Sequence, residues 1–244
     1  MRWFLSGEGA SDLGVESARG FKPGPMALLL AKMATKLGES LGFNEDADFE
    51  YVHKARLGEE AAGMPAAKKS IRLPGLKKKK ETGYFFNNAR ALARIAKRYQ
   101  ADNGDAIVAV LFRDADGTAS AGRGNWQDKY NSMLHGFAQE RLDTGVAMLP
   151  KPKSEAWLLC ALRANPYQNC AGLENRSGND ASPNSLKGEL AQLASALDVV
   201  HLAVDVVQWS CQKIESGDVD PEKINMPSFT AFRNALKSAL QPTR

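Results

Sequence analysis

The amino-acid sequence predicts an α/β protein: a mostly parallel sheet of about four strands, flanked by helices, with a helical appendage at the C-terminus. Strand-like apolar runs alternate with amphipathic stretches along the first part of the chain. The clearest run, AIVAVLF at residues 106–112, is apolar throughout, as expected for a strand buried on both faces of a parallel sheet. Beyond residue 165 the pattern changes to polar loops and amphipathic helices.

The predicted elements follow one another in a β-α-β-α-β-α-β-α order. Strands are expected at residues 3–5, 49–53, 106–112 and 146–149. Helices are expected at residues 25–41, 84–99, 125–137 and 154–162, where apolar residues recur three or four apart. In the appendage, Ser182 and Pro183 have the residue types of a helix start. Two further helices are expected at about 197–214 and after Pro227. We therefore divide the chain into an α/β core, 1–165, and a helical extension, 166–244.

Composition indicates a globular protein of the cell interior. The chain has 244 residues, of which 43% are hydrophobic and 25% charged, values close to globular averages. No apolar run approaches the roughly 20 residues needed to cross a bilayer, and the apolar run at the N-terminus is too short for a signal peptide. We expect a cytoplasmic protein without membrane contact. The net charge of +4 is compatible with binding nucleic acid.

The cysteines and histidines do not form a recognisable site. Cys160, Cys170 and Cys211 are widely spaced and odd in number, and none forms a CxxC pair. The histidines are scattered along the chain. We therefore expect neither a structural zinc site nor a disulfide framework, and a reducing compartment.

Acidic residues directly follow two of the predicted strands. Gly7-Glu8-Gly9-Ala10-Ser11-Asp12 comes after the first, and Arg113-Asp114-Ala115-Asp116-Gly117-Thr118 after the strongest. Taken alone, each motif also fits an ordinary turn. Because the carboxyl ends of parallel strands meet at one edge of the sheet, the two motifs together predict converging carboxylates. Such carboxylates repel one another unless a cation neutralises them, and oxygen ligands suit Mg²⁺ or Mn²⁺.

The two motifs resemble those of the Toprim domain, a Rossmann-like fold shared by topoisomerases, primases, OLD-family nucleases and related bacterial defence proteins. The resemblance covers Glu8 to Asp12 and Asp114 to Asp116, in the same order and each after a strand. KPKSEAWLL at residues 151–159 and MPSF at residues 226–229 are similar to segments of small stand-alone Toprim-like proteins near the OLD group. The motifs lie farther apart than in a minimal Toprim domain, and we interpret residues 61–83 as an insertion. No tyrosine domain of the topoisomerase kind accompanies them.

The resemblance implies a Mg²⁺-dependent nuclease that hydrolyses nucleic-acid phosphodiesters. Glu8 would be a metal ligand and general acid or base, with Asp114 and Asp116 as metal ligands. Asp12 is expected as an outer ligand and Glu155 as an additional one. Related proteins often act with an ATPase partner in defence against phage, so the resemblance implies such a partner here. Independently, Lys153 stands beside the predicted site, where its charge would stabilise a developing phosphorane or a leaving oxygen.

Basic residues are concentrated in the insertion. Residues 61–80 contain no acidic side chain and seven basic ones: Lys68, Lys69, Arg72, Lys77, Lys78, Lys79 and Lys80. Together with Arg123 they are candidates for binding a nucleic-acid backbone. A solvated surface loop is the alternative interpretation.

Two other functions are open on the sequence alone. Residues 112–118, FRDADGT, resemble the nucleophile loop of haloacid-dehalogenase-like phosphatases, in which Asp114 would attack phosphate and Asp116 act as acid or base. Such a phosphatase has no use for Glu8. The third possibility is a catalytically inactive module that binds nucleic acid or a partner protein. The sequence does not distinguish DNA from RNA and does not specify an oligomeric state.

Overall fold

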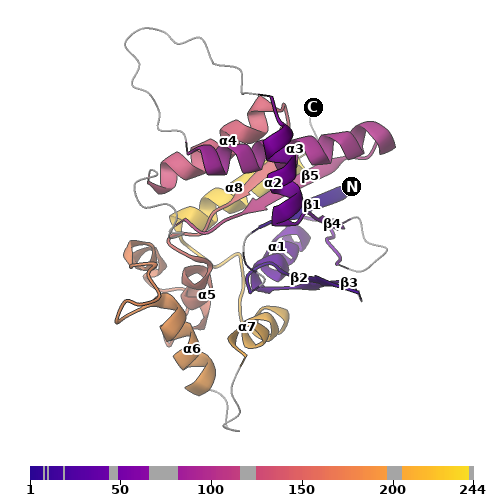
Figure 1. Cartoon of the computed structure of the whole chain (residues 1–244). Helices are drawn as coiled ribbons and strands as arrows, with labels where there is room; N and C mark the ends of the chain where they lie inside the picture. Colours follow the sequence, from indigo (N-terminus) through magenta and orange to yellow (C-terminus); the bar gives the residue numbers. More distant parts are fainter. Residues whose placement is uncertain are drawn as a thin grey trace.

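A computed structural model describes residues 1–244 with the exception of 8, 10, 19, 44–48, 66–81, 116–124, 197–204 and 242–244. The predicted fold class is confirmed: four parallel strands form one sheet with helices on both faces (Figure 1). The strands are β1 (Arg2–Ser6), β4 (Phe49–Tyr51), β5 (Ile107–Phe112) and β6 (Gly145–Met148), in the spatial order β4-β1-β5-β6.

Alternate residues of β1 face two separate hydrophobic layers, as strand geometry requires. Phe4 packs with α2 (Lys54–Gly63), α3 (Gly83–Asn103) and α4 (Trp126–Gln139). Trp3 and Leu5 pack with α1 (Pro25–Lys36), α5 (Ser154–Leu162) and α8 (Pro227–Leu240). The central strand β5 is buried along its whole length, which explains its uninterrupted apolar sequence.

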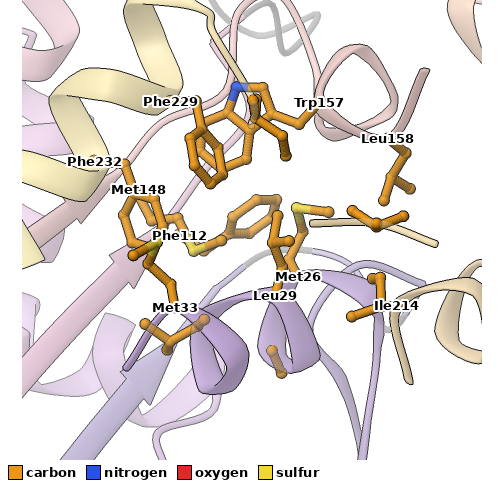
Figure 2. Close-up of a cluster of buried hydrophobic side chains, with 14 of the residues drawn as sticks. Met26, Leu29, Met33, Phe112, Met148, Trp157, Leu158, Ile214, Phe229 and Phe232 are labelled. Atoms are coloured by element: carbon orange, nitrogen blue, oxygen red, sulfur yellow. The ribbon is translucent and has the colours of Figure 1, made fainter. Parts of the chain in front are cut away.

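Helix α8 is an integral part of the second layer. Trp157 of α5 is fully buried, with ring centroids 4.9 Å from Phe229 and 5.7 Å from Phe232 of α8. Figure 2 shows these rings beside Phe112 and Met148 of the sheet. The last helix therefore covers the same sheet face as α1.

The remaining elements pack mainly on the helices. They are the antiparallel hairpin β2 (Gly14–Ser17) and β3 (Gly20–Pro23), the 3₁₀ helix η2 (Cys170–Asn175), α6 (Leu186–Ala196) and α7 (Val206–Glu215). Both α6 and η2 contact α5, and α7 and β3 contact α1. The hairpin, α2 and η2 were not expected from the sequence. Of the helices in the part of the chain that the structure describes, none has the length and apolarity to cross a bilayer.

Two predictions are wrong. Ser182 and Pro183 lie in a turn, and α6 begins at Leu186, with the Ser185 hydroxyl accepting a hydrogen bond from the Gly188 amide. Cys160 and Cys170 form a disulfide that joins α5 to η2, whereas no disulfide was expected. Their pairing follows from packing of these two elements, which an odd cysteine count cannot reveal.

Removing the Phe229 side chain tests whether α8 belongs to the core. We expect Phe229→Ala to lower the free energy of unfolding by about 3–5 kcal/mol, because it opens a cavity in a fully buried cluster. Chemical denaturation monitored by circular dichroism measures the loss. Leu134→Ala, at a position 36% exposed on α4, is the control and should change stability by no more than about 0.5 kcal/mol. Equal effects of the two substitutions would contradict the packing of α8 on the sheet.

Candidate functional site

The acidic motifs follow β1 and β5, which are neighbouring strands of the sheet. The chain leaves β1 toward α1 on one face of the sheet and leaves β5 toward α4 on the other. Neighbouring parallel strands whose connections diverge in this way form a topological switch point, where α/β proteins bind their ligands. The two strands that carry the acidic motifs flank this switch point.

Backbone hydrogen bonds fix the position of Asp12 between β1 and α1. The amides of Asp12 and Leu13 donate to the Gly9 carbonyl at 3.2 and 3.3 Å, and the Asp12 carbonyl accepts from the amide of Met26, in the first turn of α1, at 2.9 Å. Gly9 has a φ of 85°, which a residue with a side chain rarely adopts. The glycine thus allows the tight turn that presents Asp12.

The turn after β5 orients Asp114. The amide of Ala115 donates to the carbonyls of Pro150 and Pro152, at 3.2 and 3.1 Å, and its methyl group is buried in the layer of α3 and α4. Asp114 extends in the other direction, where its Oδ1 accepts a hydrogen bond from the backbone amide of Ser154 at 3.0 Å.

Ser154 connects three carboxylates. It is the first residue of α5 and is 2% exposed. Its amide binds Asp114, and its hydroxyl donates to Asp12 Oδ1 at 2.5 Å and lies 3.3 Å from Glu155 Oε2. The positive end of the α5 dipole favours anionic groups at this position. The site therefore joins the loop after β1, the loop after β5 and the N-terminus of α5.

Burial places the carboxylates of Asp12 and Glu155 under electrostatic strain. Desolvation raises the pKa of Asp12, while the hydrogen bond from Ser154 and the nearby charges of Lys153 and Lys187 act in the opposite direction. Desolvation also raises the pKa of Glu155, and the negative charge of Asp12 adds to the effect. Both groups are thus harder to ionise than in water. A bound cation would favour their ionised forms.

The oxygen atoms at the site are of the type that binds hard cations. Asp12, Asp114 and Glu155 supply carboxylate oxygens, which Mg²⁺ and Mn²⁺ prefer, and neither thiolate nor imidazole takes part. Among the described residues, no three acidic, histidine or cysteine side chains are arranged to enclose an ion. Glu8 and Asp116, the other two predicted ligands, lie outside the described residues.

The remaining predicted residues have different outcomes. Lys153 lies beside the site, as expected, and its Nζ donates to Asp180 Oδ1 at 2.8 Å. Arg123 and the basic residues of the insertion lie outside the part of the chain that the structure describes: Lys68, Lys69, Arg72, Lys77, Lys78, Lys79 and Lys80. Their role in binding nucleic acid stays a prediction.

Two residues at or beside the site, Ser154 and Lys129, were not predicted from the sequence. Ser154 stands between Lys153 and Glu155 at a predicted helix start, where a serine hydroxyl is typically used as a hydrogen-bonding group, so the sequence contained a signal. Lys129 contacts the Asp114 turn from α4, and nothing in its sequence context indicates burial.

Comparisons with family models, with curated proteins and with solved structures find no match to this chain. The Toprim resemblance therefore rests on the residues of the two motifs and on their places in the sheet.

The raised pKa of Asp12 predicts an unusual effect of neutralising it. A carboxyl whose pKa is higher in the folded protein contributes stability below its unfolded pKa, and this contribution is lost as the pH rises through the folded pKa. In EDTA at neutral pH we therefore expect Asp12→Asn to raise the thermal unfolding midpoint, with the gain disappearing in strongly acidic buffer. Differential scanning calorimetry over a pH series measures it.

Asp218→Asn is the matched control. A hydrogen bond from Lys213 lowers the pKa of Asp218, so this substitution should reduce stability at neutral pH or leave it unchanged. A loss of stability in Asp12→Asn under the same conditions would show that Asp12 is not electrostatically strained.

Proposed function

We propose that the chain is a Mg²⁺-dependent nuclease that hydrolyses nucleic-acid phosphodiesters at a Toprim-type site. The observation that carries the proposal is the convergence of Asp12, Asp114 and Glu155 on Ser154 at the switch point of the sheet. Asp12 and Asp114 would hold the cation, together with Glu8 and Asp116 from the same two loops. When bound, Mg²⁺ supplies charge neutralisation for phosphate oxygens and activation of water.

The described residues contribute negative and positive charge. Glu155 would be an additional ligand: burial raises the pKa of its carboxyl in the metal-free chain, and a bound cation would favour the ionised form. Lys153 donates a hydrogen bond to Asp180, and its positive charge partly offsets the desolvation that raises the pKa of both Asp12 and Glu155. There it would attract the phosphate of a substrate and offset charge that develops during cleavage.

The Toprim resemblance implies the wider setting of the proposed activity, namely an ATPase partner and a role in defence against phage. The cytoplasmic location is inferred from composition. The basic residues at 68–80 and Arg123 would bind the nucleic-acid backbone.

A cleavage assay tests the proposal. The purified chain is incubated with single- and double-stranded DNA and RNA in Mg²⁺, Mn²⁺ or EDTA, and with p-nitrophenyl phosphate. We expect cleavage of a nucleic acid that requires the metal, and a loss of about 10²-fold or more in Asp114→Asn, because this carboxylate helps to bring the cation to the site. Hydrolysis of the phosphate monoester alone would favour the phosphatase.

Asp105→Asn is the control for this assay. Asp105 precedes β5 at the opposite edge of the sheet, where it accepts a hydrogen bond from Tyr99. The Asp105→Asn substitution should leave the rate of cleavage unchanged. Binding of nucleic acid without cleavage in either metal, with the same affinity in Asp114→Asn, would replace the nuclease by a binding module.

A further inference from the structure

A buried lysine contacts the turn that carries Asp114. Lys129 is 5% exposed and lies in the second turn of α4. Its ammonium group donates a hydrogen bond to the carbonyl of Ala115, and its Nζ lies 5.6 Å from the centre of the Phe85 ring. A capping box between Asn125 and Asp128 fixes the N-terminus of α4. The backbone position of Lys129, which follows directly, is therefore well defined.

Burial of an ammonium group is costly unless hydrogen bonds and nearby charges compensate for it. The Ala115 carbonyl and the face of the Phe85 ring supply part of this compensation. An apolar residue at position 129 would avoid the cost entirely. The presence of a lysine therefore points to a function of the bond itself, namely fixing the backbone of the turn.

The bond from Lys129 completes a set of restraints around Ala115. The Ala115 amide is bound by the carbonyls of Pro150 and Pro152, and its methyl group is 6% exposed in the core. With the carbonyl also held, the backbone of Ala115 has little freedom to rotate. Asp114 is then directed toward the amide of Ser154.

We propose that Lys129 is a positioning residue for the metal site: it fixes the Asp114–Ala115 backbone so that the Asp114 carboxylate faces the N-terminus of α5. This inference rests on the proposed metal-dependent function. It assigns to Lys129 no contact with substrate or metal.

The sign of the effect on metal affinity separates positioning from simple electrostatics. The ammonium group of Lys129 contacts the residue that follows Asp114, so by Coulomb's law alone its removal would strengthen the binding of a cation at Asp114. Loss of a positioning contact has the opposite effect, because misdirected ligands bind more weakly. Substitutions of residues that orient metal ligands typically reduce affinity by about 10–100-fold.

The test compares Lys129→Met with Lys97→Met. Lys97 is the control, since its Nζ also donates to a backbone carbonyl, that of Glu140 at the end of α4, at 2.8 Å and near the opposite edge of the sheet. Mn²⁺ dissociation constants are measured by electron paramagnetic resonance on the full chain without nucleic acid. Thermal unfolding in EDTA reports the structural cost of each substitution.

We expect Lys129→Met to weaken Mn²⁺ binding by about tenfold or more, while Lys97→Met stays within about twofold of the unsubstituted chain. Binding by Lys129→Met that is equal to or tighter than that of the unsubstituted chain overturns the role of Lys129 but leaves the metal site standing. Absence of Mn²⁺ binding in the unsubstituted chain overturns both proposals. If Lys129→Met does not fold, Lys129→Gln and Lys97→Gln replace the pair, with the same expectation and the same overturning result.

Discussion

The parallel pairing of β1 with β5 is the constraint on which the rest of the structure depends. The two strands are in register from Arg2 opposite Ile107 to Ser6 opposite Leu111. Both therefore end at the same edge of the sheet, so loops that are far apart in sequence leave side by side. Because β6 pairs with β5 in the same direction, the chain that follows β6 also returns to this edge and begins α5 there. The meeting of Asp12, Asp114 and Ser154 is a direct consequence.

The site combines electrostatic strain with a rigid surrounding. Burial opposes ionisation of Asp12 and Glu155, a pattern that is common where stability is given up for function. Contacts of Trp157 and Cys160 fix the position of α5, which begins at the site. Cys160 is linked to η2 by the disulfide, and the indole of Trp157 donates to the hydroxyl of Ser228 at 2.8 Å. The Ser228 amide in turn donates to Glu174 of η2. These contacts keep the N-terminus of α5 in place despite the charges that it faces.

Elements with a strong hydrophobic pattern were predictable from sequence, and elements without one were not. Helices α3, α4, α5 and α8 and strands β1, β5 and β6 lie close to their predicted positions because their apolar residues face a core. Helix α2 was missed because Leu57 is its one buried residue among those described. The hairpin was missed because β2 is largely exposed and has no alternation to detect. The disulfide depends on the packing of α5 against η2, which is a tertiary contact.

The sequence by itself determined the α/β class, the strands that carry the acidic motifs and the presence of Asp12, Asp114 and Glu155 near one edge of a sheet. These features follow from local periodicity and from the common direction of parallel strands. Only the tertiary structure decided that β1 and β5 are neighbours, that Ser154 joins the carboxylates and that Lys129 holds the Ala115 carbonyl. Strand order and side-chain contacts between distant segments depend on how the layers pack, and no local pattern encodes them.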